Sequence, residues 1–599
     1  MPCQVIQETN VVISGVHCKC KTLPSTSGSD EDLANGFNKY FSEKINTIRS
    51  TFDTHTHFDN SLELSSRSSS SLTNFEPATL SELSKIVTET DIKTSPDDPL
   101  PAPLVKKSMS ILLPHILELV NLSLKYGDIS GLKESVITPI LKKLGLDKDV
   151  NGNYRPVVNL QFVGKIIEKV ILKRLTSHMT ANNLHCKHQF GYKKQHSTET
   201  MLLEIVDEVL IGFEQKSATV LILLDMSSAF DTVDINKLLQ ILESKFKMEG
   251  TALKWFQSFL TGRTQKVIIN GKLSDVILTL YGVPQGSVLG PVLFNMYVDS
   301  LPSFIQQLGF SSSLYADDTN ARLSFALKFQ FYNISIKVPD LISKVTEWMS
   351  KFFLKINPGK TELMLFCPPN FKNEHRIQGI FLDDSCVRFS ESARLLGVQF
   401  DTFMTFDEHV NKVVSECWYH LRNIRKIKRY LTSEETHKLI HAMISSKLDY
   451  CNALMYGIKS STIAKLQTIQ NQAARIICSI PAGISVPDSI FYDLHWLKVQ
   501  ERIVFKYLLL VHKFFIGSAP VYFADLLLVK SSSEHLLYTR FMNTVSGRHS
   551  FSYAAPRFWN RLPAASRMEE NTEHFKKLIK TALFRNTNNI MQAVRMYNG

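Results

Sequence analysis

Three aspartates stand directly after apolar segments and are the first candidates for chemistry. Residues 220–224 lead into Asp225, and residues 313–316 lead into the adjacent Asp317 and Asp318. If the two segments are neighbouring strands, the carboxylates meet, and their like charges repel unless cations neutralise them. Two divalent ions about 3.5–4 Å apart, bridged by carboxylates, drive in-line phosphoryl transfer. Hard oxygen ligands of this kind suit Mg²⁺.

Each segment taken alone has a simpler interpretation. Asp225 and the serines after it suit the N-terminal cap of a helix. An adjacent pair of aspartates is common in surface turns. Both segments in one chain favour a shared acidic site, because chance seldom produces the two together.

The elements that must position these aspartates are predicted from periodicity. Apolar runs bounded by glycine and proline predict strands at 219–224, 267–269, 313–316 and 395–400, with Asp317 and Asp318 at the tip of a hairpin. Helical patterns occur at 33–52, after Thr79, at 104–124 with a kink or a restart at Pro114, and at 163–175. Beyond residue 406 the pattern is helical to about residue 510. The chain is therefore a mixed α/β centre followed by a helical section.

The composition fits a large folded protein with an anionic partner. Of 599 residues, 44% are hydrophobic and 21% charged, which excludes a disordered, collagenous or repeat-array protein. The 68 basic and 56 acidic residues leave a net charge of +12, which favours nucleic acid as a partner. Nine dispersed cysteines predict no disulfide framework. With no signal peptide and no membrane-spanning run, we expect an intracellular protein, nuclear or cytoplasmic.

Three ordered motifs resemble the reverse transcriptase family. Residues 315–318 read Tyr-Ala-Asp-Asp, similar to its active-site hairpin, and residues 225–231 read Asp-Met-Ser-Ser-Ala-Phe-Asp, similar to its preceding catalytic strand. Residues 282–291, Gly-Val-Pro-Gln-Gly-Ser-Val-Leu-Gly-Pro, resemble its nucleotide- and template-positioning loop. A lone pair of aspartates is a weak signal, whereas this set in this order is strong.

Further segments extend the resemblance over residues 33–585. They are Asn-Tyr-Arg-Pro at 153–156 and the stretches 354–362, 394–401, 495–497 and 554–563. The later stretches are similar to the polymerases of non-LTR (LINE) retrotransposons, in the jockey-like and chicken-repeat-like group. The resemblance implies an α/β right-hand polymerase with fingers, palm, thumb and a helix-rich C-terminal domain. The endonuclease that precedes the polymerase in this group is not recognisable here, so we expect the polymerase part of such an element.

The resemblance also implies roles for single residues. Asp225, Asp317 and Asp318 would bind two Mg²⁺ ions, with Mn²⁺ as a substitute, assisted by the carbonyl of Met226. Phe230 would exclude a 2′-hydroxyl, although periodicity alone favours a core phenylalanine. Gln285 and Gly286 would contact nucleotide and template.

The same resemblance assigns the cations around the nucleotide. Arg155, with Lys142 or Lys143, would hold phosphates, because arginine binds phosphate with two parallel hydrogen bonds. Lys360 would donate a proton to pyrophosphate, and a solvated lysine after a turn is the alternative.

One basic segment is a candidate nucleic-acid-binding helix. Five cations fall within eight residues, while apolar residues at 421, 424, 427 and 431 keep helical spacing. The cations are Arg422, Arg425, Lys426, Lys428 and Arg429. In the family this region is the thumb, which grips the duplex backbone without reading sequence. The alternative is an ordinary solvated helix face.

Four regions are expected along the chain. They are a partly disordered N-terminal extension with a serine-rich linker (1–75), fingers and palm (76–400), a helical thumb (401–482) and a C-terminal domain (483–599). The expected partners are an RNA template, a DNA primer or target DNA, and dNTPs, with no membrane; the sequence makes no prediction of oligomeric state. Two alternative hypotheses stay open: an idle nucleic-acid-binding remnant, and an RNA-dependent RNA polymerase, against which Phe230 argues.

Overall fold

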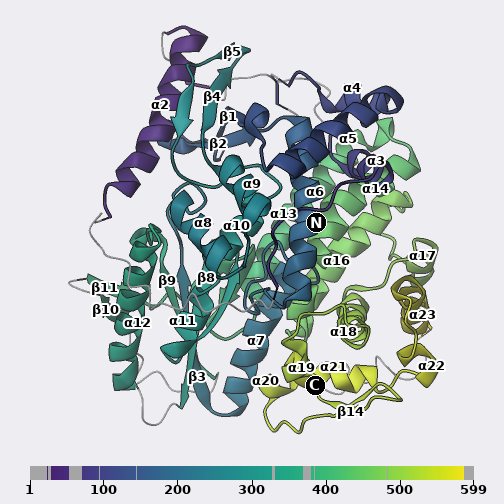
Figure 1. The fold of residues 1–599 in the computed structure, drawn as a ribbon. Helices are drawn as coiled ribbons and strands as arrows, with labels where there is room; N and C mark the ends of the chain where they lie inside the picture. Colours follow the sequence, from purple (N-terminus) through teal and green to yellow (C-terminus); the bar gives the residue numbers. More distant parts are fainter. Residues whose placement is uncertain are drawn as a thin grey trace.

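The computed structural model describes most of the chain between residues 23 and 585 (Figure 1). The described residues are 23–24, 28–52, 70–92, 95–96, 98–143, 145–326, 331–368, 379–382, 385–481 and 483–585. Most of the predicted serine-rich linker, residues 65–69, lies outside them.

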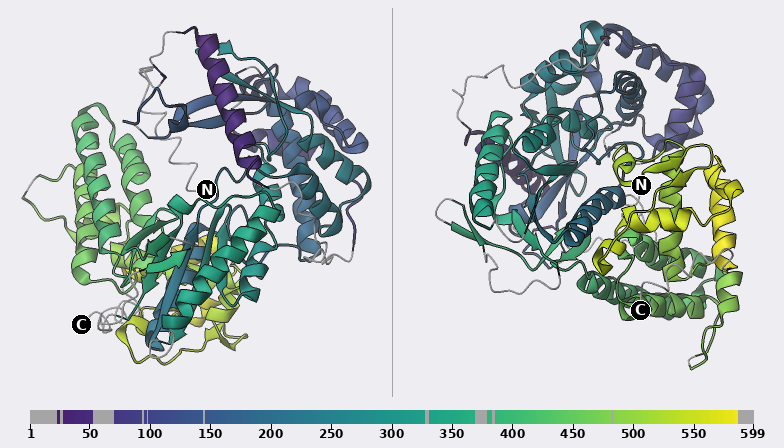
Figure 2. Two further views of the ribbon diagram at one scale, coloured as in Figure 1. Left: turned by 90° about the vertical axis from the view of Figure 1, so that its left-hand side faces the viewer. Right: turned by 90° about the horizontal axis from the view of Figure 1, so that it is seen from below.

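A five-stranded sheet forms the part that we call the fingers, at the top of Figure 1. Its strands are β1 (Glu134–Leu141), β2 (Tyr154–Asn159), β4 (Arg263–Ile269), β5 (Lys272–Leu273) and β6 (Ile277–Thr279). The order is β2-β1-β4-β5, with β6 paired to β4, and β1 runs parallel to β4. Helix α2 (Asp30–Arg49) lies across this sheet in Figures 1 and 2.

Helices complete the fingers on the side away from α2. They are α3 (Leu80–Glu89), α4 (Ala102–Lys107), α5 (Met109–Tyr126), α6 (Phe162–Ala181) and α9 (Gly250–Leu260). Thr79 caps α3, as its position predicts, by accepting a hydrogen bond from the Glu82 amide. The predicted restart at Pro114 is wrong, because α5 runs through this residue and the helix breaks at Ser108 instead; the alternative, a kink at Pro114, stays a prediction. Pro114 lies in the second turn of α5, where it removes one backbone hydrogen bond without ending the helix.

A four-stranded antiparallel sheet forms the palm, in the order β7-β8-β3-β9. Its strands are β3 (Ser217–Leu224), β7 (Ser311–Tyr315), β8 (Asp318–Ala326) and β9 (Glu362–Phe366). The helices around it are α7 (Thr198–Glu214), α8 (Ile235–Ser244), α10 (Gly290–Tyr297), α11 (Leu301–Gln307) and α12 (Phe331–Lys351). Residues 218–224 of β3 are all buried, which confirms the prediction of a central strand covered on both faces.

Two small hairpins follow the palm sheet. They are β10 (Gly379–Leu382) with β11 (Ser385–Arg388), and β12 (Ser392–Leu395) with β13 (Val398–Asp401). The prediction of one strand at 395–400 is wrong. Leu396 and Gly397 take positive φ angles of 47° and 85°, so the chain reverses there and its apolar residues divide between two strands.

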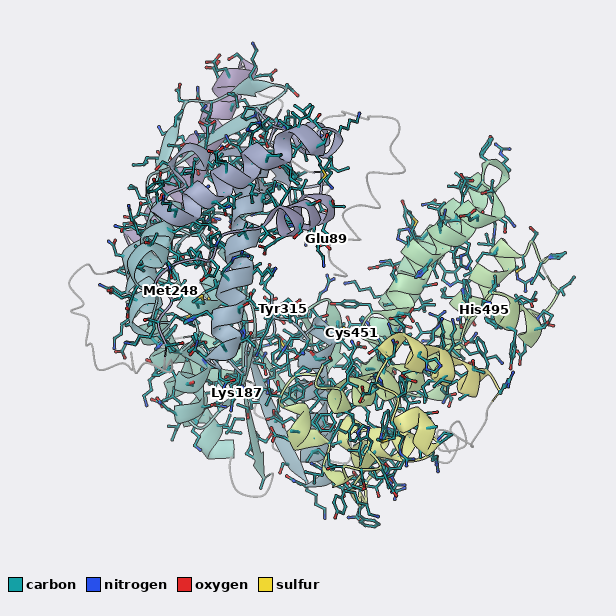
Figure 3. All side chains as sticks on the ribbon, turned by 45° about the vertical axis from the view of Figure 1, so that its right-hand side comes forward. Glu89, Lys187, Met248, Tyr315, Cys451 and His495 are labelled. Atoms are coloured by element: carbon teal, nitrogen blue, oxygen red, sulfur yellow. The ribbon has the colours of Figure 1, made fainter. Side chains whose placement is uncertain are left out.

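In the described residues after 401, the regular elements are helices apart from the short strand pair β14 (Val529–Ser531) and β15 (Leu536–Leu537). The thumb helices are α13 (Asp407–Ile427), α14 (Ser433–Ile440), α15 (Ser446–Asp449) and α16 (Ser460–Ile477). The C-terminal helices are α17 (Asp488–Asp493), α18 (Val499–Phe515), α19 (Phe523–Leu526), α20 (Val545–Arg548), α21 (Phe551–Trp559), α22 (Ala564–Arg567) and α23 (Thr572–Phe584). In Figure 3 the pale green thumb helices stand opposite the fingers.

The hydrophobic core explains how these parts are joined. One cluster unites the fingers helices with one face of the palm sheet. A second cluster unites α7 and the other face of that sheet with the thumb and the C-terminal helices. The palm therefore has the thumb and C-terminal helices built directly onto it through α7. Among the described residues, no helix has the length and hydropathy needed to cross a membrane.

Candidate active site

The palm sheet brings the three predicted aspartates together. Leu224, the last residue of β3, pairs with Thr319 near the start of β8, so Asp225 lies beside the β7–β8 turn. Tyr315 pairs with Asp318 across that turn, which leaves a two-residue loop containing Asp317. This confirms the predicted hairpin with carboxylates at its tip. Figure 3 places Tyr315 between the fingers and the thumb.

The charges of these carboxylates act on one another. Burial raises the pKa of Asp317, and the charge of Asp225 raises it further. Burial and the charges of Asp317 and Asp225 raise the pKa of Asp318 to about 6. Lys360 offsets part of this repulsion, since its Nζ lies 3.2 Å from Oδ2 of Asp225. The Lys360 side chain is 67% exposed, so its ammonium remains open to solvent and to a ligand.

The chemistry of this donor set fits divalent cations. Within the part of the chain that the structure describes, no three side chains of His, Cys, Asp or Glu lie close enough together to hold a metal ion. The three aspartates nevertheless supply hard oxygen donors whose mutual repulsion a bound cation relieves. The carbonyl of Met226 is nearby in the chain, on a backbone segment fixed by its pairing with Ile356.

Phe230 lies on a firm support close to the aspartates. Its ring stacks on that of Phe294 in α10, with centroids 4.4 Å apart and planes 25° apart. Its carbonyl accepts a hydrogen bond of 2.9 Å from the Val283 amide, in the predicted nucleotide loop. The ring is only partly buried, so it has one packed face and one accessible side.

The loop at residues 282–291 is tied to both the palm and the fingers. Nε2 of Gln285 donates to Oδ1 of Asp231 over 2.6 Å, and burial raises the pKa of Asp231 to about 6. Gly286 has a φ of +74°, and a Cβ there would come within 2.6 Å of the Val158 carbonyl oxygen in β2. Only glycine fits this close approach without strain.

A buried glutamate that sequence reasoning missed holds the end of the same loop. Glu168 of α6 accepts hydrogen bonds from the amides of Val288 (2.7 Å) and Leu289 (3.0 Å). Burial raises its pKa to about 7, although these bonds and the charge of Arg263 act in the opposite direction. The available signal was a glutamate among the apolar residues 166, 167, 170 and 171 of the helix, a position typical of a buried side chain.

The back of the catalytic hairpin contains a buried polar network. Arg322 of β8 is 2% exposed, and its Nε donates to Glu208 over 2.7 Å. Its Nη1 donates to Ser313 Oγ (2.9 Å) and Asn320 Oδ1 (2.6 Å), and its Nη2 lies 3.7 Å from Glu204. Strand β8, which follows the aspartates, is less apolar than most buried strands. Its polar side chains can be buried because the members of this network satisfy one another's hydrogen-bonding groups.

A second support, also missed from the sequence, holds the turn itself. Oε1 of the buried Gln189 accepts hydrogen bonds from the amides of Ala316 (3.0 Å) and Gly191 (2.8 Å). Ala316 has a φ of +57°, which costs energy for a residue other than glycine. A Cβ on Gly191 would lie 2.5 Å from the Ala316 nitrogen. The segment around Gln189 therefore presses directly against the catalytic turn.

Predicted phosphate-binding cations gather on the fingers side of the aspartates. Lys142 follows β1, and Arg155 pairs with Ile140 across β1 and β2. Burial lowers the pKa of Lys142, and the charges of Lys44, Lys360 and Arg155 lower it further. Lys44, Lys360 and Arg155 therefore lie near enough to Lys142 for their charges to act on it. Lys143 is exposed, and its charge is not among those acting on Lys142.

The basic end of α13 is amphipathic, as its periodicity predicts. Leu421 and Ile424 are buried, whereas Arg422, Arg425 and Lys426 are exposed. Nη2 of Arg425 donates to Gln472 Oε1 over 3.4 Å, and the other two predicted cations also have local partners. Nζ of Lys428 donates to Ser479 Oγ over 2.7 Å, and the Arg429 guanidinium lies 4.7 Å from the Tyr430 ring centroid.

Comparison with known proteins gives these features a family context. Residues 140–400 match the family described as reverse transcriptase (RNA-dependent DNA polymerase), whose members generally use divalent metal ions. The chain is 25% identical, over 61% of its length, to a probable RNA-directed DNA polymerase from transposon BS of Drosophila melanogaster. It is 26% identical, over 72% of its length, to the RNA-directed DNA polymerase from mobile element jockey of Drosophila funebris. It spans 40% and 47% of these two relatives. An apo telomerase structure from Candida tropicalis aligns over 62% of each chain, at 12% identity and a TM-score of 0.36.

Proposed function

We propose, from the premise that residues 140–400 belong to the reverse transcriptase family, that the chain is the RNA-directed DNA polymerase of a non-LTR retrotransposon. It adds dNTPs to the 3′-hydroxyl of a DNA primer, or of target DNA, on an RNA template. The observation that carries this proposal is the meeting of Asp225 with the Asp317–Asp318 turn in the palm sheet.

The aspartates hold the metal ions that the reaction needs. Asp225, Asp317 and Asp318, with the Met226 carbonyl, bind two Mg²⁺ ions, for which Mn²⁺ substitutes. When bound, such ions supply Lewis acidity to the attacking hydroxyl and to the leaving phosphate oxygen. The primer oxygen bonds to the α-phosphorus as the bond between the α-phosphorus and the bridging oxygen breaks, and pyrophosphate leaves.

The surrounding side chains orient the nucleotide. The Phe230 ring, held by Phe294, blocks the space of a 2′-hydroxyl and so selects dNTPs. Gln285, whose amide is oriented by Asp231, contacts the nucleotide, and Gly286 lets the template strand and β2 approach the loop. Arg155 and Lys142 bind phosphates, and the exposed ammonium of Lys360 protonates pyrophosphate as it leaves.

The thumb holds the product duplex. Arg422, Arg425, Lys426, Lys428 and Arg429 contact phosphates along the backbone, which gives affinity without sequence preference. Their arrangement at the end of α13 and in the 3-10 turn after it (Lys428–Tyr430) supports this role, because the apolar face of α13 is packed and its cationic face is accessible.

Primer extension tests the proposal. The full chain is given poly(rA)/oligo(dT), Mg²⁺ and dTTP, and is compared with D317N and with the control D340N. Asp340 is an exposed residue of α12 that pairs with Lys344, away from the site. Extension by the parent and D340N, with loss in D317N, is expected. Equal background from all three folded proteins would overturn the proposal and leave a binding remnant. Preference for GTP over dGTP on poly(rC) would indicate an RNA polymerase instead.

A further inference from the structure

Helix α2 is fixed in one orientation on the fingers sheet. A capping box joins Ser29 and Asp32 at its start, and Phe37 stacks edge-on against Tyr154 at 4.8 Å between ring centroids. Asn38 is 1% exposed; its amide nitrogen donates to Ser274 Oγ (2.9 Å), and its amide oxygen accepts from Gln265 Nε2 (2.8 Å). A buried amide satisfied in this way fixes the rotation of the helix about its axis.

The last residue of α2 is anchored beside the catalytic segments. Nη2 of Arg49 lies 2.8 Å from Oδ2 of Asp234, which follows the Asp225–Asp231 motif. The guanidinium also lies 4.2 Å from the ring centroid of Tyr281 and 3.8 Å from that of Phe353. Tyr281 precedes the nucleotide loop, and Phe353 precedes the segment that carries Lys360. One partly buried arginine therefore ties α2 to three parts of the site.

These two attachments place a lysine on the wall of a cavity. Lys44, one turn and a half before the end of α2, lines a space of about 200 Å³ together with Lys142, Asp231 and Gln285. This cavity lies between α2, the fingers sheet and the nucleotide loop. The charge of Lys44 acts on both Lys142 and Asp231, as their shifted pKa values record.

The two lysines of this cavity have no ion-pair partner. Within the described ranges, no ion pair joins Lys44 or Lys142 to a carboxylate, and the Lys142 ammonium donates to the Gly152 carbonyl over 2.6 Å. The only carboxyl among the residues that line the cavity is that of Asp231, which accepts a hydrogen bond from Gln285, so the like charges of Lys44 and Lys142 still attract an anion into the space. A polyphosphate matches this arrangement, because its several negative oxygens can satisfy separate cations at once.

We propose that Lys44 binds the phosphates of the incoming nucleotide, and that Arg49 positions it by anchoring α2. This inference rests on the proposed function and adds to it a phosphate-binding side chain from outside the matched residues 140–400. Lys44 touches the substrate, whereas Arg49 acts only through the helix.

Steady-state kinetics on poly(rA)/oligo(dT) test the lysine against a matched control. K44A is compared with K39A, since Lys39 lies on the same helix, is 73% exposed and pairs only with Glu43. We expect K44A to raise the KM for dTTP about fivefold to tenfold, with kcat within about twofold of the parent, because one charge-assisted phosphate contact is lost. K44R should restore most of the effect. A KM equal to that of K39A, or weaker primer–template binding at an unchanged KM, would overturn the proposal.

The role of Arg49 is tested by non-additivity. R49A should raise the KM for dTTP like K44A, and the double variant should be no worse than either single variant, because both changes remove the same contact. Multiplicative effects would show that Arg49 acts by another route.

A binding measurement separates failure of this inference from failure of the proposed function. Calorimetry with inorganic tripolyphosphate, without metal, is expected to show affinity in the parent and K39A and about fivefold weaker binding in K44A. That result in a chain without polymerase activity would keep the anion site and reject the polymerase. If the parent is an active polymerase and K44A binds tripolyphosphate as tightly as the parent does, the proposed function is kept and the role of Lys44 is rejected.

Discussion

The front of the β7–β8 hairpin leaves charges facing one another, whereas its back buries a charge among partners. At the front, Asp317 and Asp318 repel each other and Asp225, and an exposed lysine compensates only in part. At the back, Arg322 is enclosed by two carboxylates and two further oxygen acceptors. One hairpin thus carries an electrostatically strained face and a satisfied face.

This difference indicates that the front of the hairpin serves ligand binding and the back serves stability. Unrelieved repulsion costs stability, and it creates a site that gains free energy when a cation or substrate binds. A satisfied network adds no affinity for a ligand but fixes the strands that carry the aspartates. Substitutions at the front should therefore change activity more than stability, and substitutions at the back should do the opposite.

The largest effect is expected at the front, in D225N. Loss of this carboxylate, which we propose as a metal ligand, should lower the single-turnover rate about 1,000-fold or more. The free energy of unfolding, measured in urea, should stay unchanged or rise, because the repulsion of Asp317 and Asp318 is reduced. A loss of stability above about 2 kcal/mol would show that the front also holds the fold together.

The corresponding change at the back is R322M. Removing the guanidinium leaves Glu204 and Glu208 without their counter-charge, so stability should fall by about 3–5 kcal/mol. Urea denaturation measures this loss, with R561M as a control because Arg561 is exposed. Unchanged stability together with lost activity would reverse the assignment of the two faces.

F230A tests whether the front is also shaped by packing. F230A removes the ring that rests on Phe294 and leaves room for the 2′-hydroxyl of UTP. The preference for dTTP over UTP should therefore fall about tenfold to 100-fold. F230Y keeps the ring and should keep the preference. Competition between the two nucleotides during single additions measures both variants, and equal discrimination by F230A and the parent would exclude this role.

The exposed cations of α13 extend the comparison to the surface. Replacing Arg422, Arg425 and Lys426 by glutamine should weaken binding of an RNA–DNA duplex about tenfold at 0.15 M salt and lower the slope of log K against log salt by about 2–3. Stability should change little. Titrations at several salt concentrations give the slope, with K438Q as the control, since Lys438 pairs with Glu434 on α14. An unchanged slope would place the duplex elsewhere.

Glu168 is an intermediate case, buried yet held by backbone amides rather than by a close cation. Its pKa of about 7 exceeds the ordinary 4.5, so the folded chain binds a proton that the unfolded chain releases. Its contribution to stability is therefore present below about pH 4.5 and is lost as the pH rises through 7. E168Q should remove this dependence and be about 1–3 kcal/mol more stable than the parent at pH 8. Parallel stability curves for the two proteins between pH 5 and 8 would contradict the assignment.

The sequence predicted the front of the hairpin better than the back. Asp317 and Asp318 are neighbours in the chain, and an apolar strand precedes Asp225, so two local patterns and their order along the chain were enough to predict this face. Arg322 bonds to Glu208, 114 residues away, and Ala316 to Gln189, 127 residues away. No local pattern connects such partners. The roles assigned to Arg155, Phe230, Gln285 and Lys360 remain predictions.

The sharing of one core by α7 and the C-terminal helices has a consequence for synthesis of the chain. The amide of Ser552 donates to the buried Asp207 of α7, 345 residues earlier, and Phe575 and Leu583 belong to the cluster that packs against α7. While the chain is still on the ribosome, this face of the palm is uncovered and the helix behind Arg322 has no final support. This face of the palm is therefore completed only after α23 has emerged, and we expect a translation product that ends before α21 to leave it uncovered.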